Sequence, residues 1–286
     1  MNRPLVKKVK GDGIFIQVAI WEGKGKIVLC LHGLTANCRC WDVIASDLAP
    51  VHTIIAMDLR GRGESDKPPS GYSVDTHCKD IQAVLEDLKV KRAVIMGHSL
   101  GAFIAIVFAA RYPDYVDQLI LVDGGGKLNP DQFAKVFAGI KPSLDRLGQV
   151  FPSFDDYIKM MKQAPFLQPW MPALETYYRY EVEELDNGQV RPVIRRESIE
   201  EESASLAGLD ISQFYVSLKC PVLILRATEG LLTGDDLVLP EDVARRMVSE
   251  ICDVQLVELK GANHYSILFR PMEERKRAIL QFLAGT

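Results

Sequence analysis

The pentapeptide Gly97-His98-Ser99-Leu100-Gly101 has the residue types of a turn that presents a nucleophile. An apolar run typical of a buried strand (residues 93–96) precedes it, and an apolar stretch typical of a helix (residues 102–110) follows it. A serine on such a bend is held with its hydroxyl exposed, and the two glycines remove Cβ atoms that would clash where strand and helix pass closely. We therefore predict that Ser99 is a nucleophile for acyl transfer.

A nucleophilic serine needs a base, and histidine is the usual one. The chain has five histidines: His32, His52, His77, His98 and His264. His98 is next to the serine with its side chain directed away, His32 precedes a glycine loop, and His52 and His77 lie in segments typical of a protein surface. His264 follows the last strand-like run and is expected at the carboxyl edge of the sheet, where ligands bind in open α/β sheets. We predict that His264 is the base.

The oxyanion of an acyl transfer needs hydrogen-bond donors. The segment Leu31-His32-Gly33-Leu34-Thr35 ends an earlier strand-like run, so we expect the backbone N–H groups of Leu34 and Leu100 to face one oxygen. The next loop, residues 58–65, reads Asp-Leu-Arg-Gly-Arg-Gly-Glu-Ser. Its charged residues are expected to hydrogen-bond the loops around the site. No helix with Lys-Ser/Thr follows it, which argues against phosphate binding.

The carboxylate that orients the histidine has several candidates at this edge of the sheet. Asp123 follows one strand-like run directly, and Glu229 lies four residues past the next one. Asp235 and Asp236 lie further along that second loop. We favour Glu229, because loops on adjacent strands can bring its carboxylate to His264, and we keep Asp123 as the alternative.

These residues require a parallel sheet, and the hydrophobic pattern predicts one. Apolar runs rich in β-branched residues alternate with helical patterns, at residues 27–31, 53–57, 93–96, 119–122, 222–225 and 254–257. Residues 15–21 alternate as an antiparallel edge hairpin would. Helices are predicted over residues 78–88, 242–248 and 273–283.

The alternation stops between residues 126 and 215, a segment rich in proline, methionine and aromatic residues. We predict a helical cap here, inserted into a core made of residues 1–125 and 216–286. Methionines and aromatic residues suit a pliable apolar pocket. The alternative is a second small core with no role in binding. Residues 186–188, Asp-Asn-Gly, predict a hairpin turn, and residues 197–202 a charged helix.

The composition is that of an ordinary globular protein of 286 residues, 48% hydrophobic and 25% charged. The net charge of −4, from 34 basic and 38 acidic residues, does not indicate a nucleic-acid or membrane partner. Without a signal-like or membrane-spanning run, we expect a cytoplasmic protein, monomeric or homodimeric. The six cysteines have no zinc or disulfide spacing and are interpreted as reduced packing residues.

The motifs His32-Gly33, Asp58-x-Arg60-Gly61-x-Gly63-x-Ser65, Gly97-x-Ser99-x-Gly101 and Gly261-x-x-His264 occur in the order found in the α/β-hydrolase family. The chain most resembles the carboxylesterase and lactonase subgroup with a helical cap, which includes enzymes that open acyl-homoserine lactones. Members usually have Gly-x-x-Asp after the strand that ends here at Leu225-Arg226. This chain has Ala227-Thr228-Glu229-Gly230 instead, a departure that fits a displaced glutamate.

The resemblance implies an α/β-hydrolase fold and a serine hydrolase that cleaves small to medium apolar esters or lactones without a metal or organic cofactor. Ser99, Glu229 and His264 would form the catalytic triad. The same triad can also serve C–C bond hydrolysis, perhydrolysis or cofactor-free haloperoxidase chemistry. A serine nucleophile argues against a haloalkane dehalogenase or epoxide hydrolase. A ligand-binding member of the fold without catalysis is a further alternative.

Overall fold

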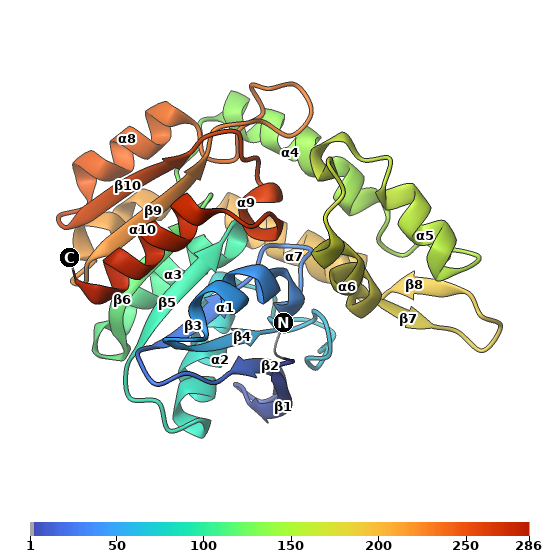
Figure 1. Cartoon of the computed structure of the whole chain (residues 1–286), viewed down its shortest axis with the longest axis horizontal. Helices are drawn as coiled ribbons and strands as arrows, with labels where there is room; N and C mark the ends of the chain where they lie inside the picture. The colour runs from blue at the N-terminus through green and yellow to red at the C-terminus, as the bar shows by residue number, and fades with distance from the viewer. Residues whose placement is uncertain (1–2, 286) are drawn as a thin grey trace.

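The computed structural model describes residues 3–285, and within them a twisted eight-stranded sheet forms the centre of the molecule (Figure 1). Its strands are β1 (Leu5–Lys10), β2 (Phe15–Trp21), β3 (Ile27–Leu31), β4 (Thr53–Met57), β5 (Ala93–His98), β6 (Val116–Val122), β9 (Val222–Ala227) and β10 (Val254–Leu259). Their spatial order is β1-β2-β4-β3-β5-β6-β9-β10. The strands from β4 to β10 are parallel, which confirms the predicted sheet.

The predicted hairpin at the start of the chain is confirmed, but its edge strand is β1. β2 pairs antiparallel with β1 on one side and with β4 on the other. The side chains of β2 are therefore mostly buried, whereas those of β1 are mostly exposed.

Helices cover both faces of the sheet. They are α1 (Asp42–Leu48), α2 (Val74–Asp87), α3 (Leu100–Arg111), α8 (Glu241–Glu250), α9 (Ser266–Phe269) and α10 (Glu273–Ala284). Side chains alternate along each strand, so Val94 and Met96 of β5 pack with α1, α9 and α10, whereas Ala93 and Ile95 pack with α2, α3 and α8. The predicted helices are confirmed. The shorter α1 and α9 were not predicted.

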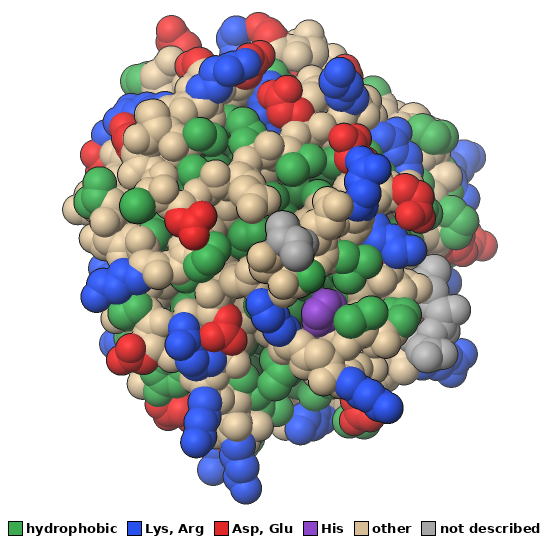
Figure 2. Space-filling model, turned by 60° about the vertical axis from the view of Figure 1, so that its left-hand side comes forward, with side chains coloured by type: hydrophobic (Ala, Val, Ile, Leu, Met, Phe, Trp, Pro, Cys, Tyr) green, Lys and Arg blue, Asp and Glu red, His purple; other side chains and the backbone are tan. Residues whose placement is uncertain are grey.

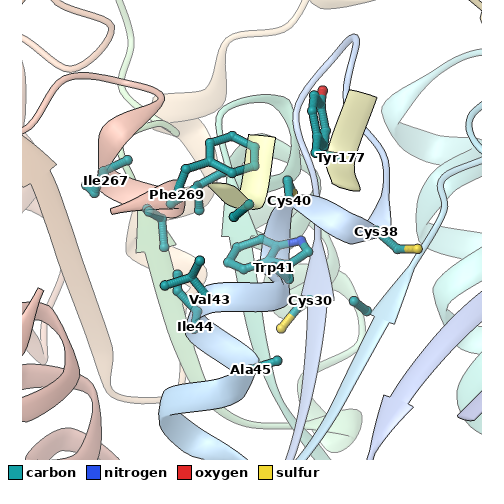
Figure 3. Close-up of a cluster of buried hydrophobic side chains, with 14 of the residues drawn as sticks. Cys30, Cys38, Cys40, Trp41, Val43, Ile44, Ala45, Tyr177, Ile267 and Phe269 are labelled. Atoms are coloured by element: carbon teal, nitrogen blue, oxygen red, sulfur yellow. The ribbon is translucent and has the colours of Figure 1, made fainter. Parts of the chain in front are cut away.

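Figure 3 shows the first of these two clusters around Trp41, which is fully buried in the short 3-10 helix η1 (Cys38–Trp41). Cys30 and Cys40 lie in the same cluster. All six cysteines are free; four are buried, and burial raises the pKa of the Cys30 thiol. The burial of these four agrees with the interpretation of the cysteines as mostly packing residues.

A largely helical segment is inserted between β6 and β9, on the right-hand side of Figure 1. It contains α4 (Pro130–Asp145), α5 (Phe154–Met161), the 3-10 helix η3 (Pro165–Leu167), α6 (Pro172–Glu181), β7 (Val182–Glu184), β8 (Val190–Pro192) and α7 (Arg196–Ala207). β7 and β8 pair antiparallel, which confirms the hairpin predicted at residues 186–188. The apolar side chains of α5 and α6 belong to the same cluster as Trp41, so they do not form a separate second core.

Ionic and polar contacts also join the inserted segment to the sheet domain. We name the contact of Glu202 on α7 with Arg62 and His77 the α7 seam. All three side chains are fully buried, the Glu202 carboxylate pairs with the Arg62 guanidinium, and His77 Nε2 lies 2.5 Å from Glu202 Oε1. The interpretation of His77 and His52 as surface residues was wrong, because both are buried. The partner of His77 lies far along the chain, where local sequence gives no sign of it.

One face of the molecule is mixed in charge. In the view of Figure 2, acidic and basic side chains are interspersed, with small apolar areas between them. Among residues 3–285, no helix is both long and apolar enough to cross a membrane.

Candidate active site

Ser99 lies on a strained bend between β5 and α3, as the sequence predicted. Its backbone has φ 56° and ψ −119°, in the region that non-glycine residues rarely occupy. The flanking glycines are required by packing. A Cβ on Gly97 would lie 2.1 Å from the Gly101 carbonyl oxygen, and one on Gly101 would lie 2.0 Å from the Leu31 carbonyl oxygen. The bend is therefore held close against the end of β3.

His264 lies in the loop between β10 and α9, and its carboxylate partner is Asp123. The His264 Nδ1 atom is 2.7 Å from Asp123 Oδ2, and both side chains are almost completely buried. The other carboxylate oxygen, Oδ1, accepts a hydrogen bond of 3.0 Å from the backbone N–H of Ala227. Asp123 is thus held at both oxygens and fixes which side of the imidazole faces it.

The loop that follows β6 brings Asp123 next to the serine. Asp123 itself has a positive φ of 44°, which turns the chain immediately after the strand. A Cβ on Gly124 would lie 2.7 Å from the Ser99 carbonyl oxygen and 2.8 Å from Ser99 Cα, so only glycine fits there. The backbones of the two loops are therefore in contact at Gly124 and Ser99.

The prediction that Glu229 orients His264 was wrong. Glu229 is exposed, and its backbone N–H donates a 2.9 Å hydrogen bond to the Ala262 carbonyl. The loop after β9 therefore contacts the loop of His264 through the Glu229 main chain. The His264 imidazole bonds to Asp123 and not to the Glu229 side chain. Asp235 pairs with Lys135 at the surface, and Asp236 accepts backbone N–H groups of its own turn. The run Gly124-Gly125-Gly126 is the sequence signal that favours Asp123, because it permits close backbone approach.

The loop after β3, which contains Gly33 and Leu34, lies beside the serine. A Cβ on Gly33 would lie 3.2 Å from Ser99 Cβ. His32 anchors this loop: its Nδ1 donates to the Gly33 carbonyl at 2.8 Å, and its Nε2 accepts from the Leu59 N–H at 3.0 Å. Burial lowers the pKa of His32 to about 3, so this pattern of one donor and one acceptor is kept.

The backbone N–H groups of Leu34 and Leu100 have no acceptor within residues 3–285. Leu100 is the first residue of α3, whose initial N–H groups have no partner inside the helix. These free donors, together with the positive end of the α3 dipole, can bind a negatively charged oxygen beside Ser99.

The turn at residues 58–65 supports these loops, which confirms the role predicted for its charged residues. Asp58 accepts hydrogen bonds from the Cys38 N–H at 2.7 Å and the Glu64 N–H at 3.0 Å. The Arg62 Nε donates to the Leu34 carbonyl at 3.1 Å. Because Arg62 is also part of the α7 seam, the turn joins the loop of Leu34 to the inserted segment.

The inserted segment contacts the site directly through Tyr265, the neighbour of His264. The Tyr265 hydroxyl is 2.7 Å from Ser143 Oγ on α4, and Phe166 stacks on its ring with centroids 4.8 Å apart. The His264 and Tyr265 rings meet edge to face at 5.7 Å. The sequence did not identify Ser143 or Phe166, because neither belongs to a local motif.

A second contact reaches the loop after β3. Arg146, at the end of α4, donates a 3.3 Å hydrogen bond to the Thr35 carbonyl and pairs with the buried carboxylate of Glu181. Tyr157 donates to the same carboxylate at 2.8 Å. No group of three metal-ligating side chains suited to a metal ion occurs within residues 3–285.

A family model described as the α/β hydrolase fold matches residues 26–271 of this chain. The chain belongs to the α/β-hydrolase family. It is 28% identical over 264 residues to 2-(acetamidomethylene)succinate hydrolase of Mesorhizobium japonicum, covering 92% of this chain and 89% of that relative.

Two further comparisons differ in extent. An uncharacterized protein of Mycobacterium tuberculosis is 42% identical over 104 residues, which is 36% of this chain and only 30% of that relative's length. The crystal structure of E-2-(acetamidomethylene)succinate hydrolase superimposes with a TM-score of 0.85 at 24% identity, covering 99% of this chain and 100% of that one. The second of these shows the shared fold.

Proposed function

We propose that this protein is a serine hydrolase that cleaves carboxylic esters or lactones through an acyl-enzyme intermediate. The observation that carries the proposal is the His264–Asp123 contact of 2.7 Å beside the strained bend of Ser99. A histidine fixed by a buried carboxylate next to a half-buried serine is the arrangement that activates a hydroxyl as a nucleophile. Membership of the α/β-hydrolase family supports it.

In the acylation step, His264 Nε2 takes the proton of Ser99 Oγ while this oxygen bonds to the substrate carbonyl carbon. The C=O electron pair moves to the carbonyl oxygen, which the N–H groups of Leu34 and Leu100 stabilise. Each such donor contributes about 3 kcal/mol to transition-state stabilisation. When the intermediate collapses, the bond to the leaving oxygen breaks, and the proton on His264 passes to that oxygen.

In the deacylation step, His264 takes a proton from water, whose oxygen attacks the acyl carbon. Collapse breaks the bond to Ser99 Oγ, which regains its proton from His264, and the carboxylic acid leaves. Throughout, Asp123 keeps the Nδ1 proton in place and stabilises the imidazolium. The free enzyme is restored without a cofactor taking part in any of these steps.

The surroundings of the site support an apolar substrate. Leu34 packs against a buried cluster of Leu147, Ile194 and Ile199 from the inserted segment. Tyr265 and Phe166 form an aromatic pair next to His264. We propose that the inserted segment is a cap whose apolar side chains hold the acyl or alcohol part of the substrate.

The test compares wild-type protein with Ser99→Ala on p-nitrophenyl butyrate and on a butyryl-homoserine lactone. We expect wild-type turnover of one or both, and a decrease of about 10⁴-fold or more in the variant, because the nucleophile is lost while binding remains. Turnover that survives in Ser99→Ala, or folded wild-type protein inactive on both substrates, would contradict the proposal.

A second candidate is hydrolysis of 2-(acetamidomethylene)succinate, favoured by the relative of that name, which aligns with 92% of this chain. Ser99 Oγ would attack the amide carbonyl carbon of this compound while His264 takes the serine proton. The C–N bond would then break, and His264 would pass the proton to the leaving nitrogen. Activity on this compound together with inactivity on the ester and the lactone would favour the second candidate over the first.

A further inference from the structure

His98 is a second histidine at the site, and its contacts are with His264. It is the last residue of β5 and is 4% exposed. Its Nε2 lies 3.0 Å from the backbone carbonyl oxygen of His264. The two imidazole rings are stacked at a tilt of 31°, with centroids 4.2 Å apart. His98 therefore contacts both the main chain and the ring of the proposed base.

The hydrogen bond defines the state of His98. The acceptor is a carbonyl oxygen, so Nε2 must carry the proton and donate. The other nitrogen, Nδ1, is buried and has no partner within residues 3–285. Burial, and then repulsion by the charge of His264, lower the pKa of His98 well below its ordinary value. His32 is the other titratable group that affects His98, and its charge also lowers the pKa of His98.

The neutral state matters because of the short distance between the rings. During acylation His264 becomes an imidazolium, and a second positive charge about 4 Å away would oppose this. A neutral ring stacked on the imidazolium does not. His98 thus supplies a contact surface and a hydrogen bond without an electrostatic penalty.

The loop of His264 needs such a support because of the sheet order. β10 is an edge strand, and β9 lies between it and β6, where Asp123 is placed. The loop must therefore extend past the end of β9 to reach the carboxylate. The bond from Nδ1 to Asp123 holds one atom of the imidazole and leaves the ring plane and the loop backbone to be fixed by other contacts.

We propose that His98 is a positioning residue that fixes the backbone and the ring plane of His264 for proton transfer with Ser99. This inference rests on the proposed function of Ser99 and His264. His98 lies on the strand face that carries Val94 and Met96, so β5 itself sets its direction. The end of β5 therefore positions the nucleophile Ser99 directly, and it positions the base His264 through His98.

The test compares His98→Leu, which removes the donor and the aromatic ring, with His98→Gln, which retains an N–H donor able to reach the His264 carbonyl. The first readout is the rate at which a fluorophosphonate probe labels the protein. We expect a decrease of about tenfold to hundredfold in His98→Leu, because a small misplacement of the base has effects of this size. His98→Gln should recover most of the wild-type rate.

The second readout needs no hydrolytic activity. The proton between His264 Nδ1 and Asp123 should give a downfield NMR resonance in wild type and in His98→Gln, and a broadened or absent one in His98→Leu. If wild-type protein is not labelled by the probe, the proposed function fails, and the NMR comparison still decides the role of His98.

The matched control is His52→Leu. His52 is also buried and makes one hydrogen bond to the main chain, in which its Nδ1 accepts the Lys26 N–H at 3.1 Å. It lies just before β4, at the amino ends of the parallel strands and therefore opposite the carboxyl edge that carries His264. We expect a lower melting temperature with an unchanged labelling rate. If folded His98→Leu behaves in the same way and retains the downfield resonance, His98 is only a packing residue and the proposal is overturned.

Discussion

The carboxyl edge of the sheet and the α7 seam each bury a histidine against a carboxylate. At the edge, His264 contacts Asp123 at 2.7 Å, and at the seam, His77 contacts Glu202 at 2.5 Å. The seam also contains Arg62, whose guanidinium pairs with the same carboxylate and has no exposed atoms. Within residues 3–285 the edge pair has no such cation, and it lies beside a serine on a strained bend.

The comparison shows that a buried histidine–carboxylate contact does not by itself define a catalytic site. At the seam, the partners lie on α2 and α7, and their contact joins the inserted segment to the sheet domain. At the edge, the free N–H groups of Leu34 and Leu100 and the half-buried Ser99 adjoin the pair. The groups next to each histidine–carboxylate pair therefore determine whether the pair has a structural or a catalytic role.

The largest expected effect separates the two candidate acids of the edge site. Asp123→Asn should decrease hydrolysis of p-nitrophenyl butyrate by about 10⁴-fold, because the amide can no longer hold the histidine in the tautomer that accepts a proton at Nε2. Glu229→Gln is the matched control and should retain nearly all activity, since Glu229 is exposed. If the two variants were equally active, Asp123 would not be the carboxylate that orients His264.

Removing the carboxylate of the seam should affect stability instead. Glu202→Gln leaves the buried Arg62 without its counter-charge, a change that destabilises proteins by about 3–5 kcal/mol. We expect the free energy of unfolding, measured by urea denaturation, to decrease by this amount. The activity of the folded Glu202→Gln variant should fall far less than that of Asp123→Asn. If Glu202→Gln were as inactive as Asp123→Asn at a temperature where it is folded, the distinction between the two regions would be wrong.

The seam should also make stability depend on acid pH. Burial raises the pKa of Glu202, but the nearby Arg62 and His77 outweigh it and lower the pKa to about 2 from 4.5. A carboxylate with a lowered pKa stabilises the fold above the unfolded value, and this contribution is lost as the pH falls from about 4.5 towards 2. The contribution is about 3 kcal/mol. Unfolding free energies of wild type and Glu202→Gln should converge across this pH interval; a constant difference would contradict the assignment.

The sequence predicted the sheet, the bend at Ser99 and the position of His264 because these depend on local patterns. A strand followed by Gly-x-Ser-x-Gly and a helix has one geometry, set by the space that the glycines leave at Leu31 and Gly101. His264 follows the last parallel strand, so it had to lie at the carboxyl edge.

The choice between Asp123 and Glu229 depended on loop conformation, which spacing does not determine. Both follow strands at the same edge, and β9 lies closer to β10 than β6 does. The positive φ of Asp123 and the contact of Gly124 with Ser99 bring the Asp123 carboxylate, rather than that of Glu229, next to the serine. The α7 seam was equally beyond a local pattern, because His77 and Glu202 are 125 residues apart.

Ser99 is proposed to be a nucleophile that His264 and Asp123 activate. The most direct test is to incubate the folded protein with a fluorophosphonate and to locate the adduct by peptide mass spectrometry. We expect one adduct per chain, on Ser99, and none in Ser99→Ala or, over the same time, in Asp123→Asn. An adduct on another residue, or none on folded wild-type protein, would contradict it.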